Sequence, residues 1–520
     1  MIPALCWIPR GAARERPVKF EISAAEMARV RRLAGEEAAI EREMEEEEEE
    51  GAGAGAGAGA SGSEFADLPP GLHMDKYDDS DDDDDAMGGA RRAGARASGV
   101  GVGVGVGGGG MDDDGEEEGD DLDDDDDDGD DGSGFDELEM VPTGGGGALA
   151  IEADSEDEDA DDDEIRRTDA LLCVAITEDD FSHLEVQLLS DDGNVYTHHD
   201  ITLPEFPLCL AWMDCPPFLL EGGQQSIGNY IAVGTFDSAI EIWNLDVLDP
   251  LEPTATLGGI DTAATKKKHK KHKNKPPKLK DGSHDGHVLC MSWNKNIRQV
   301  LCSGSSDKTV KIWDVTTQVC SHTFTHHTDK VQAVQFHPSA SESWLLATGS
   351  FDRTVALVDC RTAAVASKYG LPSDIEAMAW DPFNSSRLFV TTESGLVCCI
   401  DVRQQGFPLF AFQAHEKTVS SLSFSTTVPG MLATASTDKV VKVWDTASES
   451  ELPQLVAYKS MNIGKLFTLQ YYHNNPFLLA CAGDKGQVAF WESDEVKEIG
   501  DRFNGRVDLS RETVYSASGI

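Results

Sequence analysis

A ten-residue pattern recurs along the C-terminal two thirds of this chain: an aspartate-containing turn followed by a short apolar run. SSDKTVKIWD occupies 305–314, and related runs occupy 235–244, 350–359 and 436–445. With two weaker copies, the units start at Thr235, Ser305, Ser350, Thr392, Ser436 and Gly483. Their separations are 70, 45, 42, 44 and 47 residues. A regular period of roughly 40–45 residues indicates one supersecondary unit used many times.

A second periodic feature runs in phase with the first. An aromatic residue lies 20 to 22 residues before the tryptophan position of five units: Trp293, Phe336, Trp380, Phe424 and Tyr471. In the first unit Trp212 precedes Trp243 by 31 residues, because CPPFLLEGGQQSIGN is inserted between them. Two sets of bulky residues that share one period predict that each unit has the same three-dimensional structure.

Each unit predicts four short strands. In 287–326 the runs HVLCMSWN, QVLCSGSS, TVKIWDV and SHTFTH are rich in β-branched or aromatic residues and are separated by turn residues. Apolar side chains lie on both faces, so each small sheet must stack on neighbours to be buried. Closing the stack into a ring achieves this for every unit. The predicted fold class is therefore all-β, a β-propeller.

Six units cover 208 to about 500, and residues 170–203 add three strand-like runs. We expect these runs to form most of a seventh blade, with a strand from the C-terminal segment closing the ring. The alternative is a six-bladed ring with an appended hairpin. The predicted domains are a disordered region at 1–168, a propeller at 169–500 with a lysine-rich insertion at 264–280, and a C-terminal tail at 501–520.

The recurring residues resemble those of the WD-repeat family. A histidine precedes the first strand, Ser-Asp or Thr-Asp marks the turn, and Trp-Asp ends the third strand. The resemblance implies a hydrogen-bonded His–Ser/Thr–Asp–Trp tetrad inside each complete blade, with a structural role and no catalytic one. The residues assigned to this tetrad are His287, Asp307, Trp313, His327, Asp352, His415, Asp438, Trp444, Asp237, Trp243 and Trp491. Val358 replaces tryptophan in one unit, and Ser394 and Ile400 indicate that another lacks the tetrad.

Charge separates the first third of the chain from the rest. Residues 1–168 carry a net charge of −38 out of the total of −52, in runs such as EMEEEEEE, DDSDDDDD and LDDDDDD separated by GAGAGAGAGA and VGVGVGVGGGG. Such a segment repels itself and cannot bury enough apolar surface to fold alone, so we expect disorder. The tracts could hold basic partners, fold back on the lysine insertion, or keep the chain soluble. Ser80 and Ser155 are candidate phosphorylation sites within them.

The start MIPALCWIPRGAA, the acidic region and the in-phase tryptophans together resemble the periodic tryptophan protein family. That resemblance implies a nuclear and nucleolar scaffold in ribosome biogenesis, acting in rRNA processing and large-subunit assembly, whose partners are ribosome assembly factors or pre-ribosomal particles. It also raises association with histones or chromatin. Trp7, Ile8, Pro9 and Arg10 are a candidate docking motif, since apolar anchors stand out from the acidic residues that follow; an untethered terminus is the alternative.

The lysine-rich insertion explains the spacing of 70 residues. Nine lysines and no acid lie between 266 and 280. This composition favours a solvated nuclear import signal that could contact RNA phosphates, while a tolerated loop extension is the alternative. The residues assigned to import are Lys266, Lys267, Lys268, Lys270, Lys271, Lys273 and Lys275. His269 and His272 lack the further ligands that a metal site needs.

Other functions find little support in the residues. GVGVGVGGGG neither follows a strand nor opens a helix, so it does not predict a phosphate loop, and we expect no enzyme activity, cofactor or small-molecule substrate. No apolar run reaches the length of a membrane helix. The 11 cysteines contain no CxxC pair and are expected to be reduced core residues. Arg361 and Arg403 approximate the W-D-x-R ending of cullin-ligase substrate receptors, a third functional hypothesis, although pairing with local acids is favoured.

Overall fold

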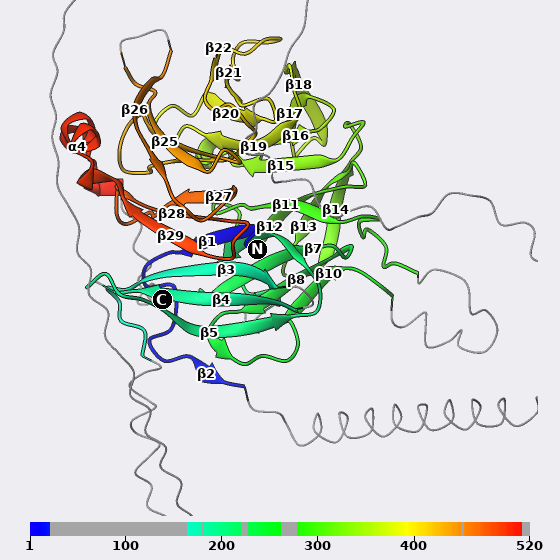
Figure 1. Ribbon diagram of the computed structural model, residues 1–520. Helices are drawn as coiled ribbons and strands as arrows, with labels where there is room; N and C mark the ends of the chain where they lie inside the picture. Colours follow the sequence, from blue (N-terminus) through cyan, green and yellow to red (C-terminus); the bar gives the residue numbers. More distant parts are fainter. Residues whose placement is uncertain are drawn as a thin grey trace, which may run out of the picture. The chain divides into compact units, whose positions relative to one another are not determined.

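The computed structural model describes residues 1–20, 164–178, 181–190, 192–219, 227–261, 278–448 and 452–511. Within these ranges, seven antiparallel sheets are arranged as blades in a ring (Figure 1). The predicted seven-bladed propeller is therefore confirmed, and the six-bladed alternative is wrong. We number the blades 1 to 7 in chain order of their outer strands. The expected disorder of the acidic tracts falls on residues outside the described ranges.

Blades 1 to 3 each contain four strands. Blade 1 consists of β1 (Ala4–Ile8), β3 (Ala170–Glu178), β4 (Phe181–Leu189) and β5 (Val195–Leu203). Blade 2 consists of β6 (Pro207–Met213), β7 (Tyr230–Thr235), β8 (Ala239–Asn244) and β10 (Ala255–Gly258). Blade 3 consists of β11 (Val288–Trp293), β12 (Val300–Ser305), β13 (Val310–Asp314) and β14 (Val319–Phe324). A short parallel pair, β2 (Val18–Lys19) and β9 (Val247–Leu248), lies outside the blades.

Blades 4 to 6 repeat this order, whereas blade 7 has three strands. Blade 4 consists of β15 (Val331–Phe336), β16 (Leu345–Ser350), β17 (Thr354–Asp359) and β18 (Ala364–Gly370), with η1 (Ala340–Glu342) between its first two strands. Blade 5 consists of β19 (Ile375–Trp380), β20 (Arg387–Thr392), β21 (Leu396–Asp401) and β22 (Phe410–Gln413). Blade 6 consists of β23 (Val419–Phe424), β24 (Met431–Ser436), β25 (Val440–Asp445) and β26 (Gln454–Ser460). Blade 7 consists of β27 (Leu466–Tyr471), β28 (Leu478–Gly483) and β29 (Val488–Glu492).

The second strand of each blade shows why the sheets stack. All six residues of β12, β24 and β28 are buried, so both faces of these strands are covered by neighbouring blades. Strands with this double burial read as continuous apolar or small-residue runs rather than as strict alternation. The core accordingly lies between adjacent blades, where clusters such as that of Val443, Leu479 and Trp491 fill the space between blades 6 and 7.

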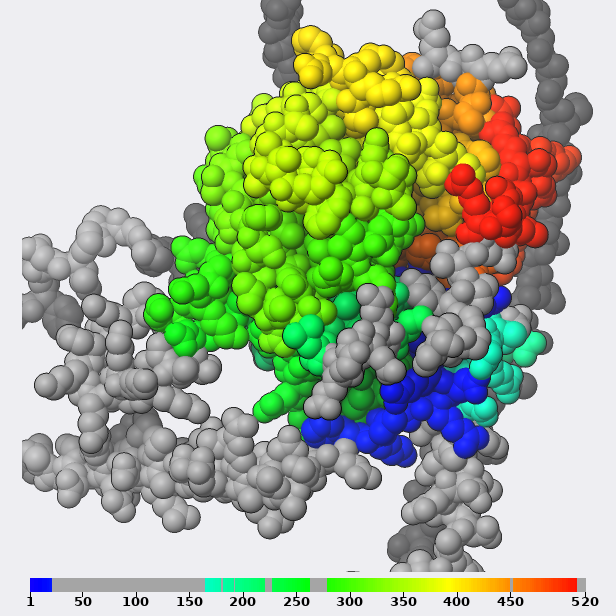
Figure 2. All heavy atoms as spheres, turned by 180° about the vertical axis from the view of Figure 1, so that it is seen from behind, coloured from blue at the N-terminus to red at the C-terminus, as the bar shows by residue number. Residues whose placement is uncertain are grey.

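The N-terminal strand β1 closes the ring. It is the innermost strand of blade 1, pairing antiparallel with β3 from Ala4 opposite Ala175 to Ile8 opposite Leu171. Figure 2 shows the N-terminal segment beside the residues that resume the chain after 164. The Met1 amino group donates to the carbonyl of Thr177 at 2.6 Å. The expectation that a C-terminal strand closes the ring is therefore wrong, as is the assignment of residues 1–20 to a region separate from the propeller.

The C-terminal segment turns away from the sheet instead of extending it. After β29 the chain forms η2 (Ser493–Glu495), α4 (Lys497–Phe503), η3 (Asn504–Arg506) and η4 (Leu509–Arg511). Arg502 and Arg506 donate to the buried carboxylate of Asp445 at the end of β25, at 2.6 and 2.9 Å. Burial raises the pKa of Asp445, but these guanidinium hydrogen bonds outweigh it and hold the pKa below its usual value. Helix α4 is thus anchored to blade 6.

No helix among the described residues has the length and apolar composition needed to cross a membrane.

Candidate interaction surfaces of the propeller

Blade 3 contains a complete tetrad. Trp313 Nε1 donates to Ser303 Oγ at 2.8 Å, and the other side of that hydroxyl contacts His284 Nε2 at 2.7 Å. His284 Nδ1 then contacts Asp307 Oδ2 at 2.9 Å. Asp307 also accepts a hydrogen bond from the backbone N–H of Thr309 at 2.8 Å, which fixes the turn before β13. The network links the turn, the second strand and the third strand of one sheet.

The tetrad histidine of blade 3 is His284, so the assignment of His287 was wrong. His287 lies three residues later and contacts the carbonyl oxygen of Phe236 in blade 2. Spacing in the sequence distinguishes the two: His327 and His415 each lie four residues before the first valine of their blade, and so does His284 before Val288. The Gly-His dipeptide at 286–287 matched the family pattern but stood at the wrong distance from the strand.

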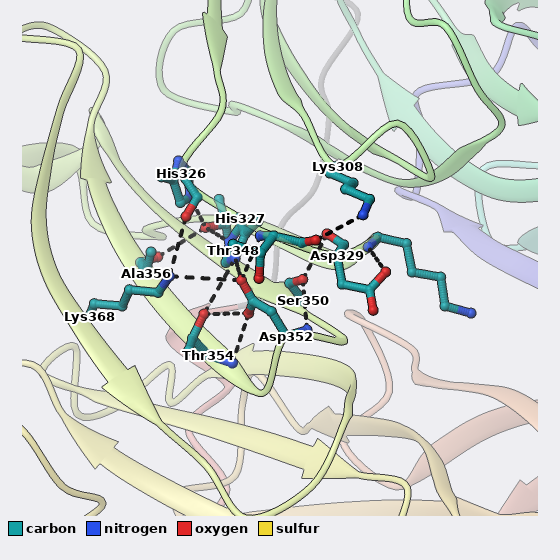
Figure 3. A network of polar contacts seen from close by, with 12 residues as sticks. Lys308, His326, His327, Asp329, Thr348, Ser350, Asp352, Thr354, Ala356 and Lys368 are labelled. Carbon is teal, nitrogen blue, oxygen red and sulfur yellow. Dashed lines mark hydrogen bonds and ion pairs between the residues drawn. The ribbon is translucent and has the colours of Figure 1, made fainter.

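Blade 4 keeps the tetrad geometry without tryptophan. His327 Nδ1 contacts Asp352 Oδ2 at 3.0 Å, and His327 Nε2 contacts Thr348 Oγ1 at 2.9 Å (Figure 3). Burial lowers the pKa of His327, so the imidazole is neutral at pH 7 despite its carboxylate neighbour. Burial raises the pKa of Asp352, but hydrogen bonds from Thr354, the Thr328 N–H and His327 outweigh it and bring the pKa to about 2. Val358, in the tryptophan position, is fully buried.

Blade 6 has the second complete tetrad. His415 Nδ1 contacts Asp438 Oδ2 at 2.9 Å, His415 Nε2 contacts Thr434 Oγ1 at 2.8 Å, and Trp444 Nε1 donates to the same hydroxyl at 3.0 Å. His415, Asp438 and Trp444 therefore lie in the arrangement predicted for them. The imidazole of His415 is buried and its contacts are all used within the blade, which leaves it no access to a substrate.

Asp237 and Trp243 of blade 2 do not meet in a tetrad. Asp237 accepts from the backbone of Ser238, and Trp243 Nε1 donates to Glu241 at 3.1 Å. In blade 7, Trp491 Nε1 has no hydrogen-bond partner among the described residues. Cys481 stands where blades 3 and 6 have the accepting hydroxyl, which explains the missing bond. Among the assigned residues, the tetrad is thus complete in blades 3 and 6, and blade 4 keeps its His, Thr and Asp members.

The in-phase aromatics share one structural position. Trp293, Phe336, Trp380, Phe424 and Tyr471 are each the last residue of an innermost strand. Trp212 is the next-to-last residue of β6. We call the face of the ring where innermost strands finish the end face, and the opposite one the start face. The periodic aromatics therefore form a ring of side chains at the end face.

Trp7 is a further member of this aromatic set. Its backbone N–H donates to Gln470 Oε1 at 3.1 Å and its indole N–H donates to the Gln470 carbonyl at 3.1 Å. Trp380 makes the same two contacts with Gln335, at 3.1 and 3.4 Å. Trp7 is 1% exposed and its ring packs 4.6 Å from Tyr472. These equivalent bonds identify β1 as an innermost strand like β19.

The candidate docking motif at residues 7–10 is therefore wrong as an exposed site. Trp7, Ile8 and Pro9 are buried in the ring, and Arg10 Nη2 donates to the carbonyl of Thr168 at 2.7 Å. The resemblance of CWIP at 6–9 to AWDP at 379–382 was the available signal, since both place tryptophan before a Pro-containing turn. Apolar anchors in this segment bind the propeller itself.

The end face has a cavity of about 380 Å³ lined by residues of the innermost strands and the turns that follow them. Its lining includes the aromatics of blades 4 to 7 together with Lys295 and His473. Burial, together with a smaller effect of the Lys295 charge, lowers the pKa of His473 to about 4, so this imidazole is neutral at pH 7. Thr426 Oγ1 and His473 Nδ1 have no hydrogen-bond partner among the described residues. The cavity is thus an aromatic recess with polar groups available for a ligand.

The acidic segment is an insertion within blade 1 rather than a preceding tail. Its two described ends meet: the Ile165 N–H donates to the Glu15 carbonyl at 2.9 Å, and Arg167 contacts Glu15 at 2.6 Å. The outgoing end is also tied to blade 2, where Arg14 and Val18 donate to Asp246. Since β1 finishes at the end face, the acidic insertion leaves the ring there and returns to the same place.

The lysine-rich insertion leaves from the opposite face. It connects β10 to β11, and a blade's outer strand finishes where the next innermost strand begins, on the start face. Its described ends are joined, since Lys280 N–H donates to the Gly259 carbonyl at 2.8 Å and the Asp261 N–H to the Lys278 carbonyl at 2.7 Å. Lys266 to Lys275, Ser80 and Ser155 lie outside the described residues, so their assigned roles stay predictions.

Arg361 and Arg403 pair with acids of their own turns. Arg361 Nη2 contacts Asp359 at 2.7 Å and Arg403 Nη2 contacts Asp401 at 2.6 Å. Among the described residues there is no group of three or more side chains placed to hold a metal ion. The cysteines in these ranges are all unpaired thiols, and most are buried.

Comparison with known proteins places the chain among its relatives. The family model "WD domain, G-beta repeat" matches residues 278–314, 318–359 and 406–445. A WD repeat-containing protein of Schizosaccharomyces pombe is 35% identical over 347 residues, covering 66% of this chain and 65% of the relative. Periodic tryptophan protein 1 homolog of Drosophila melanogaster is 31% identical over 326 residues, covering 62% of this chain and 66% of the relative. Periodic tryptophan protein 1 of Saccharomyces cerevisiae is 31% identical, covering 59% of this chain and 60% of the relative.

The chain thus spans less than two thirds of the length of each of these relatives. Two shorter similarities bear on function. U3 small nucleolar RNA-associated protein 15 homolog of Xenopus tropicalis is 32% identical over 148 residues, covering 28% of this chain and 27% of the relative. Histone acetyltransferase type B subunit 2 of Candida glabrata is 26% identical over 236 residues, covering 42% of this chain and 55% of the relative.

The innermost-strand aromatics, the three matched repeats and the named relatives lead to one conclusion. The chain is a WD-repeat propeller and a homologue of periodic tryptophan protein 1 of fly and yeast, and Trp7 makes the same inner-strand contacts as its periodic Trp380.

Proposed function

We propose that this protein is a non-enzymatic scaffold for protein–protein interactions in ribosome biogenesis, acting in the nucleus and nucleolus on rRNA processing and large-subunit assembly. The observation that carries the proposal is the similarity to periodic tryptophan protein 1 homologues, joined by the shorter similarity to a U3 small nucleolar RNA-associated protein. Fold alone does not give function, so the surfaces must supply the reason.

The two charged insertions support a scaffold role. The acidic insertion leaves blade 1 at the end face, and the lysine-rich insertion leaves blade 2 at the start face. Oppositely charged segments attract different partners: polyanions for the lysines, basic proteins for the carboxylates. A rigid ring between them would hold a basic assembly factor and an RNA-containing particle at fixed positions. The histidines of the three tetrads are occupied by structural bonds, which agrees with a non-catalytic ring.

Sedimentation of a cell extract tests this function. We expect the tagged full-length chain to cofractionate with large pre-ribosomal particles, and to be released when those particles are dissociated by high salt, because charged contacts weaken with ionic strength. A chain found wholly in light fractions, with normal pre-rRNA processing after its depletion, would contradict the proposal.

A chromatin role is the second candidate, because the histone acetyltransferase subunit matches a larger part of this chain than the U3-associated protein does. In that case the acidic insertion would attract lysine-rich histone tails. Nucleosome pull-down without recovery of ribosomal precursors would favour it. Recovery of a cullin adaptor would instead favour a ubiquitin-ligase receptor, for which Arg361 and Arg403 are unsuited because both are paired within the chain.

Nuclear import can be tested separately. We expect a variant lacking residues 266–280 to accumulate in the cytoplasm, since this segment carries nine lysines and no acid. Its matched control replaces the same segment with a Gly/Ser linker bearing an unrelated import signal, which should restore nuclear localisation. Unchanged nuclear localisation of the deletion variant would defeat the import hypothesis.

A further inference from the structure

Blade 7 has an unpaired edge in the described ring. It has three strands, whereas the other six blades each have four. β29 pairs with β28 on one side, and on its other side no described strand bonds to it. The chain leaves β29 through η2 and α4, and α4 is anchored to Asp445 of blade 6 (Figure 1). Ile499 and Phe503 of α4 pack into the cluster between blades 6 and 7, but this segment supplies no described strand beside β29.

Exposure agrees with an open edge. In blades 3 and 4 the corresponding third strands are buried from Val310 to Trp313 and from Val355 to Val358. In β29, by contrast, Val488, Ala489 and Phe490 are all partly exposed. A fourth strand covers the edge of its neighbour, and its absence leaves main-chain donors and acceptors accessible for pairing.

The edge of β29 is recessed between the two neighbouring blades. We call the space beside β29, between β26 of blade 6 and β5 of blade 1, the slot. Blades 6 and 1 stand on either side of blade 7, and each has a fourth strand that reaches about 4.8 Å beyond the level of β29. Blade 7 therefore lacks one strand relative to both of its neighbours. The slot excludes the edge of a second propeller, whose own β29 is recessed in the same way, but it admits a single extended chain.

The wall of the slot on blade 1 is polar and anionic. Leu172 and Val174 of β3 pack against blade 7. Residues directly opposite in an antiparallel pair point to the same face, so Glu185, opposite Val174, faces blade 7 too, and so does Asp200, opposite Glu185 in β5. Glu185 accepts hydrogen bonds from Gln187 at 2.9 Å and from Thr197 at 3.3 Å. Asp200 is exposed and available for a cation.

The wall on blade 6 is mostly apolar. Trp491 is 1% exposed, and the Lys459 ammonium lies 5.2 Å from the centre of its ring. Ala457 of β26 is partly buried against the same cluster. A strand in the slot alternates its side chains between the two walls. Its chemistry should alternate too, with basic or amide groups toward Glu185 and Asp200, and small apolar groups toward Ala457.

We propose that the open edge of blade 7 is a docking site for an extended, basic strand of a partner protein, which pairs with β29 as the fourth strand of the blade. Main-chain hydrogen bonds supply the affinity and the two unlike walls select the side chains. The site lies apart from the end-face cavity and does not depend on the ribosomal assignment. It adds a sequence-selective contact to a ring whose inserted segments carry only diffuse charge.

The chain's own C-terminal residues do not fit the slot. Arg511, the last described residue, donates to the carbonyl of Pro382 in blade 5 at 3.0 Å, two blades away from β29. The residues beyond it, ETVYSASGI, contain no lysine or arginine to face the anionic wall. A partner strand therefore satisfies the charge of the slot better than this segment does.

Hydrogen exchange on the full-length chain tests the proposal, with a short capped peptide of alternating lysine and valine as the probe. At physiological salt we expect the peptide to slow exchange of the amides at 488–492, which in its absence exchange faster than those at 310–314. The acidic insertion also attracts lysine, so peptide binding alone would not support the proposal. Slower exchange confined to the amides of 488–492 would support it.

Charge-matched variants separate slot binding from general attraction. Asp200→Lys should weaken protection at 488–492 about fivefold, the effect of one partly exposed ion pair. Asp192→Lys changes the net charge equally from the β4–β5 turn and should leave it unchanged. Equal effects of both variants, or peptide binding without protection of 488–492, would overturn the proposal. Faster exchange at 488–492 after deletion of 512–520 would also overturn it, because the occupant would then be the C-terminal segment. Protection of 488–492 that rises with protein concentration would do the same, because the occupant would then be a second copy of the chain.

Discussion

Blades 3 and 1 fill equivalent places in one ring but are assembled in different ways. Blade 3 is continuous in sequence from 288 to 324 and is bonded by the Trp313–Ser303–His284–Asp307 tetrad. Blade 1 joins β1 to three strands that begin at Ala170, and none of the assigned tetrad residues lies in it. A local segment can use side chains to fix its own turns, whereas a split blade must be fixed by pairing between distant segments.

Backbone pairing replaces the tetrad in blade 1. Its strands β3, β4 and β5 each have nine residues, against four to seven in the other blades. β1 is further bonded to blade 7, since Ile2 N–H donates to the Gly483 carbonyl at 2.9 Å and Trp7 bonds Gln470. The comparison indicates that closure depends on eight N-terminal residues, while each tetrad strengthens a blade that already forms locally.

Removing residues 1–9 should have the largest effect. The deletion exposes the apolar inner face of β3 and the side of β27, so we expect loss of cooperative thermal unfolding, comparable with the whole stability of a domain, roughly 5–15 kcal/mol. A synthetic peptide of residues 1–13 added in trans should restore the transition. The matched control is deletion of 512–520. Equal melting temperatures for both deletions would show that β1 does not close the ring.

Trp7→Ala should cause the second largest loss of stability. Truncating a buried tryptophan removes its packing on Tyr472 and leaves a cavity, for an expected loss of about 3–5 kcal/mol in the free energy of unfolding. Trp7→Phe retains an aromatic ring but loses the bond to the Gln470 carbonyl, so we expect a smaller loss, about 1 kcal/mol from that bond. Phe407→Ala, at an aromatic that is 82% exposed, is the control and should change little. Denaturant unfolding measures all three.

His284→Ala and His287→Ala distinguish the tetrad assignment in blade 3. The first leaves the Asp307 carboxylate and the Ser303 hydroxyl short of a partner, and we expect a loss of about 1–3 kcal/mol. The second substitution affects a residue at the blade surface, so we expect it to change the free energy of unfolding by no more than about 0.5 kcal/mol. A larger loss for His287→Ala would reverse the assignment.

Lowering the pH should reduce the free energy of unfolding by less than the substitutions above, through the histidines of blades 3, 4 and 6. Burial lowers the folded-state pKa of His284, His327 and His415 below the ordinary value near 6.5. The unfolded chain then binds more protons than the folded one, so stability is fully present above pH 6.5 and falls as the pH drops through that value. Thermal unfolding from pH 7 to 5 should show this slope. It should be shallower in His327→Gln; an unchanged slope in that variant would contradict the account.

Much of the ring could be predicted because its repeats are local. SSDKTVKIWD at 305–314 and STDKVVKVWD at 436–445 carry their turn, strand and tetrad residues within one blade, so the repeat spacing together with the resemblance to WD repeats placed Asp307, Asp438 and both tryptophans. His284 was missed although its distance to Val288 was visible, because the Gly-His dipeptide three residues later matched the family pattern. The error shows that spacing to the strand is the better guide.

Closure could not be predicted in the same way. CWIP at 6–9 is separated from its partner strand by an insertion of more than one hundred residues, so no local period links them. Composition moreover favoured assigning everything before 169 to one acidic region. Only the antiparallel register of β1 with β3 and the hydrogen bonds from Trp7 to Gln470 identify the N-terminal run as a blade strand. Turn residues and strand propensities describe local structure, so they do not predict which distant strands pair with one another.

Hydrogen exchange at residues 4–8 tests the closure most directly. If β1 is an innermost strand, its amides should exchange as slowly as those of 288–293 in blade 3, because both pair with a second strand inside the ring. Complete exchange of 4–8 within the shortest labelling time, with 288–293 protected, would contradict the closed ring.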